Sequence, residues 1–157
     1  MDQDLGLKYL LVQRPECVPE ACDKWFTVKD VAAVKALIPA GSTVFLATGR
    51  QTLAEFAGMR DCRILCRVID PPQSEFPFEN GRFVVGRPSF SVQEEVNFFR
   101  SEGVDWIVVK NSGGERSKSK LIAARQLGLP VAMIERSVVP ECEVVSTADD
   151  ACAWLER

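Results

Sequence analysis

The sequence predicts an α/β fold in which a parallel sheet of about five strands carries helices on both faces. Short apolar segments alternate with amphipathic segments, which is typical of βαβ units. Two of the apolar segments, residues 44–47 and 106–109, are continuously apolar, as expected of strands covered on both faces. The length of 157 residues suits one domain, so residues 1–157 are expected to form a single α/β domain.

Five segments are expected to form the strands of this sheet, and a sixth is a candidate short edge strand. The five are residues 9–12, 44–47, 63–69, 106–109 and 131–134, and the sixth is residues 143–145. Residues 70–89 are rich in proline and glycine, which predicts a long irregular connection with a small hairpin around Asn80 and Gly81. Such connections are often functional, and a passive crossover is the equal alternative.

Helical patterns occupy the segments between the strands. One helix is expected over residues 28–38, with Thr27 as its N-cap. The segment 91–102 carries a clear signal, because Ser91 and Glu94 are spaced as a capping box and Gly103 follows. Three more helices are expected, at residues 51–57, 117–127 and 147–155.

Composition excludes several classes of function. The formal net charge of −3 argues against a general nucleic-acid binder, which usually carries a basic excess. The chain has no histidine, which removes Ser–His and Cys–His nucleophile pairs. Six cysteines show no C-x-x-C spacing, so no zinc or other metal site is expected. Cys62 and Cys66 are expected to be buried thiols that pack as small apolar side chains.

The location that the sequence predicts is the cytoplasm, without attachment to a membrane. No apolar segment approaches the roughly 20 residues that a membrane-spanning helix needs. The acidic N-terminus also lacks the basic and apolar regions of a signal peptide.

Loops that follow the strands are the candidates for a site, because ligands of open parallel sheets bind beyond the carboxyl ends of the strands. Three short loops qualify, at residues 48–51, 70–72 and 110–115. The titratable Asp70 and Glu115 lie in two of them, but solvated charges are the commoner interpretation. No catalytic proton donor is assigned from the sequence.

The loop at residues 110–115 is the most informative of the three. Gly113 and Gly114 allow a sharp turn and a close approach of the backbone to a ligand. The helix that follows would offer backbone N–H groups and a positive dipole end. Lys110 adds a charge and Ser112 a hydroxyl. A phosphate-binding loop and an ordinary turn are the two interpretations, since the Walker A order is absent.

Thr48, Gly49 and Arg50 repeat this logic after the strand at residues 44–47. Arginine suits bidentate contact with a carboxylate or a phosphate. A positive charge at a helix N-terminus is locally unfavourable, which favours a binding role for Arg50 over a surface role. Some of the other cations nearby in the sequence could face the same crevice, but such charges more often lie on a solvated face. These cations are Arg67, Arg116, Lys118, Lys120 and Arg136.

Four motifs in register resemble the precorrin-6A reductase family, which includes the cobalt-precorrin-6A reductases. Residues 44–51, VFLATGRQ, resemble the family's VFLTTGRQ segment, and residues 67–72 resemble its R-x-I-x-P-P segment. Residues 110–114, KNSGG, followed by KLIAAR at residues 120–125, resemble its KNSGG and K-L-x-A-A-R segments. The strand at residues 129–133 also matches. The likeness extends over nearly the whole chain.

The resemblance implies two Rossmann-like α/β halves with NADPH and the substrate in the cleft between them. It implies reduction of one double bond of precorrin-6A or cobalt-precorrin-6A in cobalamin biosynthesis, with the hydride supplied by NADPH. The substrate is an anionic tetrapyrrole, which gives Arg50 and Lys110 natural partners. The residues implied to bind cofactor or substrate are Thr48, Gly49, Arg50, Lys110, Asn111, Ser112, Gly113, Gly114 and Lys120.

Departures from the family pattern concern mainly its first half. A G-G-T-x-E-like loop and a D-A-T-H-P-F-like motif are both missing, so the chain resembles the C-terminal half only. A fragment, a separately encoded half with a separate N-terminal partner, and a shortened gene product all fit. A non-catalytic module that binds a dinucleotide or a tetrapyrrole is the alternative function. Lys118 also stands where the family has a neutral, often aromatic residue.

Overall fold

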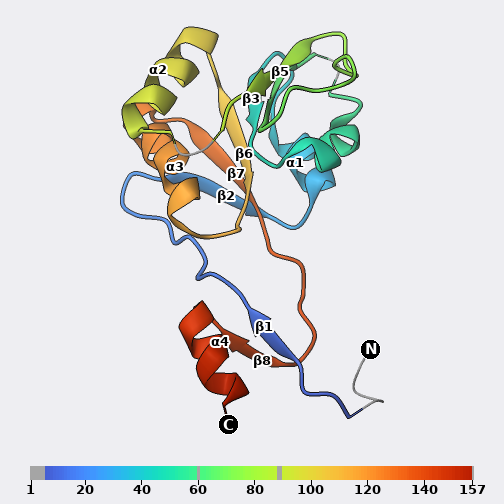
Figure 1. Ribbon diagram of the computed structural model, residues 1–157. Helices are drawn as coiled ribbons and strands as arrows, with labels where there is room; N and C mark the ends of the chain where they lie inside the picture. The colour runs from blue at the N-terminus through green and yellow to red at the C-terminus, as the bar shows by residue number, and fades with distance from the viewer. Residues whose placement is uncertain (1–5, 60, 88–89, 157) are drawn as a thin grey trace.

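A six-stranded parallel sheet forms the centre of the computed structural model, which describes residues 6–59, 61–87 and 90–156. The spatial order of its strands is β2-β7-β6-β3-β4-β5 (Figure 1). They are β2 (Lys24–Val28), β3 (Thr43–Leu46), β4 (Arg63–Val68), β5 (Gly81–Val85), β6 (Trp106–Lys110) and β7 (Pro130–Ile134). The predicted fold class, an α/β fold with a parallel sheet, is therefore confirmed.

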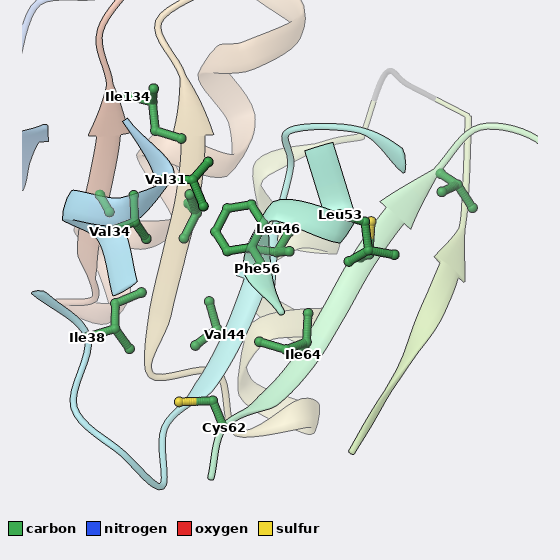
Figure 2. Close-up of a cluster of buried hydrophobic side chains, with 14 residues drawn as sticks. Val31, Val34, Ile38, Val44, Leu46, Leu53, Phe56, Cys62, Ile64 and Ile134 are labelled. Atoms are coloured by element: carbon green, nitrogen blue, oxygen red, sulfur yellow. The ribbon is translucent and has the colours of Figure 1, made fainter. Parts of the chain in front are cut away.

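Helices cover both faces of this sheet. The α-helix α1 (Val31–Leu37) and the 3-10 helix η2 (Arg50–Phe56) pack on one face, and α2 (Val92–Glu102) and α3 (Glu115–Leu127) on the other. Successive strand residues point to opposite faces. Val44 and Leu46 therefore join the first cluster (Figure 2), while Phe45 joins the second. Burial on both faces explains why the segment is continuously apolar.

A second, two-stranded sheet lies apart from the first (Figure 1). In it β1 (Leu10–Val12) pairs in parallel with β8 (Glu143–Val145), and α4 (Ala148–Leu155) follows. We call these three elements the ribbon. Strands were predicted in both places, but the expectation that they join the large sheet is wrong, because the two pair with each other. No residue of α4 is buried.

The strand β2 was missed by the sequence analysis, and the predicted helix start at Thr27 was wrong. Residues 24–28 pair with β7, with Thr27 opposite Met133, so Val28 ends a strand. The N-cap of α1 is Asp30, whose carboxylate accepts a hydrogen bond of 2.9 Å from the backbone of Ala33. Aromatic and β-branched side chains favour strands, and here this preference outweighed the helical spacing.

The predicted hairpin around Asn80 and Gly81 is also wrong. Gly81 begins β5, which runs parallel to β4, whereas a hairpin needs antiparallel strands. A Cβ at Gly81 would lie 2.2 Å from the carbonyl oxygen of Ile64, so only glycine permits this close approach of the two strands. The glycine therefore marks strand pairing and not a turn.

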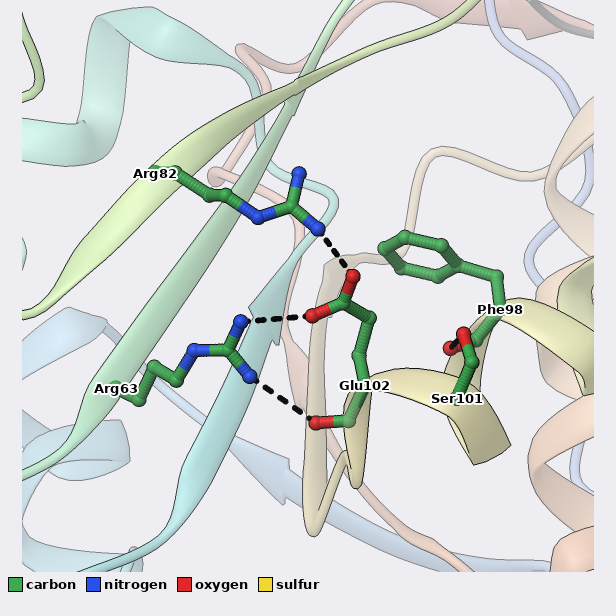
Figure 3. Close-up of polar contacts among 5 residues, drawn as sticks. All are labelled: Arg63, Arg82, Phe98, Ser101 and Glu102. Carbon is green, nitrogen blue, oxygen red and sulfur yellow. Dashed lines mark hydrogen bonds and ion pairs between the residues drawn. The ribbon is translucent and has the colours of Figure 1, made fainter.

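The ends of α2 agree with the sequence analysis. Ser91 and Glu94 form the predicted capping box, and Gly103 adopts the left-handed conformation that ends the helix. Glu102 then binds Arg63 of β4, at 2.7 Å, and Arg82 of β5 (Figure 3). These ion pairs attach the end of α2 to the starts of both strands, away from the carboxyl ends where a ligand is expected.

Two further observations concern burial and membranes. Cys62 and Cys66 are both buried in the cluster beneath α1 and η2, as predicted. Across the described part of the chain, no helix combines the length and apolar character that crossing a bilayer requires.

Candidate functional site

The carboxyl ends of all six strands form one edge of the large sheet, and the chain changes direction between β3 and β6. From β3 the chain adds β4 and β5 on one side, and then returns to place β6 on the other. Ala47, just after β3, donates a hydrogen bond of 2.9 Å to the carbonyl of Val108 in β6. The two loops selected from the sequence therefore lie at the point where ligands of such sheets bind.

Among the hollows near this edge, two contain a lysine that was predicted as a site residue. The first, which we call the Lys110 hollow, has a volume of about 500 Å³ and lies on the side of α1 and η2. Lys110, Asn111 and Ser112 line it together with Lys29 and Arg136. Its acidic lining residues are Asp30, Glu55 and Glu135. Cations and carboxylates thus share this hollow.

The second hollow, which we call the Lys120 hollow, has a volume of about 230 Å³ and lies beside α2 and α3. Gly49 and Lys120 line it, while Gly114 lines a third hollow and Asn111 also lines a fourth, so the predicted site residues do not share one hollow. Arg67 and Glu95 form its charged floor and Phe90 one wall. Of the other predicted residues, Arg50 is exposed.

Thr48 and Gly49 differ in what surrounds them. The Thr48 hydroxyl accepts a hydrogen bond of 2.9 Å from Thr52, so it braces the start of η2. Gly49 has φ of +84°, and no atom of the described residues lies within 4 Å of where a Cβ would stand. Open space above this glycine fits the approach of a ligand, whereas Thr48 already has a structural partner.

Asn111 has a structural role that the sequence did not reveal. Its side-chain oxygen accepts a hydrogen bond of 2.9 Å from the backbone of Cys17, and its amide donates one of 3.4 Å to the Cys17 carbonyl. The backbone carbonyl of Asn111 accepts a bond of 2.5 Å from Arg136. The side chain therefore holds residues 13–17 across the loop.

Gly113 and Gly114 allow the chain to pass closely over itself. A Cβ at Gly113 would lie 2.1 Å from the carbonyl oxygen of Pro15, and one at Gly114 would lie 3.0 Å from the side chain of Arg14. Both glycines have positive φ, of +68° and +87°. The loop turns as sharply as predicted, and in this structure residues 14–15 occupy the space above it.

The start of α3 nevertheless keeps features of an anion site. Gly114 is its N-cap, and no side chain of the described residues caps the helix there. The Arg14 guanidinium stands beside this positive helix end, an arrangement that an anion would stabilise. The Ser112 and Ser117 hydroxyls are 3.5 Å apart at the same place. Backbone amides, hydroxyls and a cation thus converge there.

The segment before β2 is fixed to α3 by an ion pair. Arg125 donates two hydrogen bonds to Asp23, of 2.9 and 3.0 Å. Burial raises the pKa of Asp23, but the bonds from Arg125 and the backbone of Glu20 outweigh it and hold the pKa below its ordinary value. Residues 13–23 are thereby attached at both Asn111 and Arg125.

Three charged residues at this edge were not predicted as site residues, and two of them, Arg67 and Arg136, were expected on a solvated face, whereas their side chains are largely buried. Arg67 binds Glu95 through two hydrogen bonds, of 2.5 and 3.0 Å, and the Glu95 side chain is only 1% exposed. Arg136 keeps one buried nitrogen, Nη2, without a partner among the described residues. The signal was present, because Arg67 interrupts an apolar strand and Glu95 precedes Val96 on the apolar face of a helix.

Lys120 has an altered acidity in its hollow. Burial lowers the pKa of its ammonium, and the neighbouring Arg67 lowers it further, while Glu95 acts in the opposite direction. Lys120 makes no hydrogen bond or ion pair with any residue that the structure describes. It was predicted as a site residue, and its surroundings suit a group that awaits an anionic partner.

Comparison with known proteins gives one consistent result. Residues 2–156 match the family model described as "Precorrin-6x reductase CbiJ/CobK". The precorrin-6A reductase of Rhodobacter capsulatus is 38% identical over 151 residues, covering 96% of this chain and 60% of that protein. That of Rhodococcus erythropolis is 36% identical over 152 residues, covering 96% of this chain and 61% of that protein.

The fold is shared as well as the sequence. A solved structure of CobK precorrin-6A reductase superposes with a TM-score of 0.93 and 37% identity, over 99% of this chain and 64% of that one. The chain thus spans somewhat less than two thirds of the length of these relatives. On the family match and the identity together, the chain belongs to the precorrin-6x reductase family.

Proposed function

We propose that this chain supplies the larger part of an NADPH-dependent precorrin-6A reductase, acting in cobalamin biosynthesis on precorrin-6A or its cobalt-bound form. Family membership supports the reaction class. The observation that carries the proposal is the pair of cation-bearing hollows at the point where the strand order reverses. A reduced dinucleotide and a carboxylate-rich tetrapyrrole are both anionic, so both suit this edge.

The start of α3 is the place where a phosphate of the dinucleotide would bind. Helix-end amides without a side-chain cap, the Ser112 hydroxyl and the Arg14 guanidinium would together hold a phosphate. The cofactor, when bound, supplies the hydride, and the protein supplies orientation and electrostatics. Lys110 and Arg50 would bind anionic groups of cofactor or substrate, and Gly49 would let one of them approach the backbone.

Substrate orientation is the second task of these residues. Asn111 and Arg136 would keep the segment 13–17 in place, so that the wall of the Lys110 hollow keeps its shape. Gly113 and Gly114 would contribute the turn that brings this segment over the loop. We assign no proton donor.

Partners follow from the length of the relatives. We propose that the activity needs a further polypeptide, equivalent to the part of the relatives that this chain does not span, as an N-terminal half. The ribbon supports this, because two strands alone rarely form a stable sheet. We propose that the protein acts in the cytoplasm and that the reaction involves neither a nucleic acid nor a membrane.

Reconstitution tests the proposal. The chain is mixed with the N-terminal part of the Rhodobacter capsulatus relative, and NADPH oxidation is followed at its absorbance band with precorrin-6A as substrate. We expect activity from the mixture, and a loss of at least about tenfold with Lys110→Ala. Arg100→Ala, an exposed cation in the last turn of α2 that is not among the residues lining either hollow, serves as the matched control. No turnover from a folded mixture that binds both ligands would sink the proposal.

A non-catalytic module is the second candidate, favoured by the cation-bearing hollows, which suit binding of an anion without a reaction. In that case the chain alone would bind NADPH or an anionic tetrapyrrole, such as uroporphyrin, without turnover in the reconstituted mixture. Titration of intrinsic tryptophan fluorescence would measure both affinities. Equal affinities for the unchanged chain and for Lys110→Ala would contradict both candidates, since each needs the cations at the sheet edge.

A further inference from the structure

The charged residues that line the Lys120 hollow leave an excess of positive charge, carried by Lys120 and by the exposed Arg116. Arg67 and Glu95 neutralise each other through their two hydrogen bonds. Glu95 is also the one carboxylate among the described residues that line the hollow. Lys120 adds an ammonium that has no hydrogen bond or ion pair within the described ranges. A partly buried cation without a partner is costly, and a ligand anion would remove that cost.

The guanidinium of Arg67 is held too firmly to serve as the ligand's main partner. Its central carbon lies 4.7 Å from the ring centroid of Phe45 and 4.1 Å from that of Phe90. These rings and the Glu95 carboxylate fix its plane. Lys120 is therefore the partly buried cation best placed to meet a ligand, beside the exposed Arg116, although the buried Nε of Arg67 also has no partner among the described residues.

Most residues that line this hollow are apolar, and a glycine is among them. Ala47, Val68, Ile69 and Phe90 contribute side chains, and the space above Gly49 is open. A volume of about 230 Å³ is smaller than the roughly 300–1,000 Å³ of pockets that enclose a whole small-molecule ligand. The hollow therefore suits one arm of a larger molecule.

We propose that the Lys120 hollow binds the carboxylate end of an aliphatic side arm of the ligand, of the size of a propionate. Apolar walls would pack against the methylene groups, and the Lys120 ammonium would donate to the carboxylate. A phosphate dianion suits the hollow less, because it would lose its hydration shell against the apolar walls. The inference deepens the proposed function, since it assigns this hollow to the carboxylate-bearing ligand rather than to the dinucleotide.

Sodium propionate is the probe that tests the inference on the full chain. Backbone amide shifts of Gly49 and Gly86, which line the hollow, are followed by nuclear magnetic resonance during titration. Sodium chloride at equal ionic strength and sodium phosphate serve as reference titrations. We expect saturable shifts with propionate that weaken about tenfold in Lys120→Met, and only small linear shifts with phosphate.

Lys118→Met is the matched control, because Lys118 carries the same charge on the same helix but is exposed and pairs with Glu115 at 2.5 Å. It should bind propionate as the unchanged chain does. Propionate shifts that persist in Lys120→Met, that vanish equally in Lys118→Met, or that phosphate reproduces would each overturn the inference. The measurement needs neither NADPH nor turnover. Propionate binding can therefore be absent while reductase activity is found, or present while that activity is absent.

Discussion

The two faces of the large sheet bury different kinds of side chain. Beneath α1 and η2, the buried cluster consists of apolar side chains and two thiols, among them Leu46, Phe56 and Cys66. Beneath α2 and α3, a comparable apolar cluster borders a guanidinium bound to a carboxylate that is 1% exposed. The same strands support both arrangements, since alternate residues of each strand point to opposite faces.

This difference shows that the fold does not need the buried ion pair. Burying two charges costs several kcal/mol for each ion before their attraction is counted, and apolar residues of similar size often do as well or better. The face beneath α1 and η2 does without such a pair. Arg67 and Glu95 lie instead at the floor of the Lys120 hollow, so the pair is best explained by the ligand that this hollow would bind.

The largest effect is expected from Glu95→Gln. This change would leave the Arg67 guanidinium buried without its counter-charge, and we expect a loss of about 3–5 kcal/mol in the free energy of unfolding, measured by urea denaturation. Glu115→Gln breaks an exposed pair and should change little. A loss with Glu95→Gln as small as that of Glu115→Gln would show that the two faces do not differ in this respect.

The double change of Arg67→Met with Glu95→Leu sharpens the same point. Stability should recover to near that of the unchanged chain, because apolar side chains would replace both charges at once. The propionate affinity of the Lys120 hollow should fall in the same variant, since its floor would be altered.

Leu46→Ala probes the apolar face, and we expect a loss of about 3 kcal/mol in the free energy of unfolding. Leu46 is fully buried in the cluster beneath α1 and η2, so the change leaves a cavity. The same substitution at Leu155, which is 75% exposed, is the control and should cost little. Because no charge is involved, the loss should not depend on salt; a marked salt dependence would contradict this account.

Some features of this fold could be predicted from the sequence and others could not. The alternation of patterns identified the fold class and the loops after β3 and β6, because local periodicity encodes both. It did not identify the partner of each strand, so β1 and β8 were placed in the wrong sheet. Pairing depends on contacts between distant segments, which periodicity does not record.

The site was foreseen in the same uneven way. Lys120 was selected as a site residue by family likeness, whereas Arg67 was expected on a solvated face and Glu95 was not considered. Their pairing was not foreseen, because 28 residues separate the two in the sequence. Asn111 was expected to bind a ligand, and its amide instead binds Cys17, 94 positions away. A charged residue inside an apolar pattern is the signal that would have revealed the pair.

Alkaline pH offers a smaller test of the apolar face. Burial raises the pKa of the Cys66 thiol from 9.0 to about 11, so the folded protein holds its proton longer than the unfolded chain does. The stability that this proton contributes is complete below pH 9 and is lost as the pH rises towards 11, by about 2 kcal/mol.

Cys66→Ala removes this titration, so the variant should lose less stability than the unchanged chain between pH 9 and pH 11. Urea denaturation across that pH range measures the difference. Parallel curves for the two proteins would show that Cys66 does not titrate as its burial indicates.

The smallest effect is expected from Lys120→Met, and it should be a gain. Burial lowers the pKa of Lys120, so the charged form is less favourable in the folded protein, and methionine should raise stability by under about 1 kcal/mol at neutral pH. The gain should shrink as the pH rises towards 10.5, the ordinary pKa of lysine, because the folded unchanged chain loses the Lys120 proton below that pH. Thermal unfolding at both pH values gives the comparison, and a loss at neutral pH would contradict it.

The ribbon is attached to the large sheet by two segments, one between β1 and β2 and one between β7 and β8 (Figure 1). Two covalent attachments prevent free rotation and leave bending about a single axis as the easiest movement. Gln13 on one segment and Ser137 on the other both line the Lys110 hollow. A ligand there would touch both attachments together, so occupancy of the hollow and the angle of the ribbon would be mechanically linked.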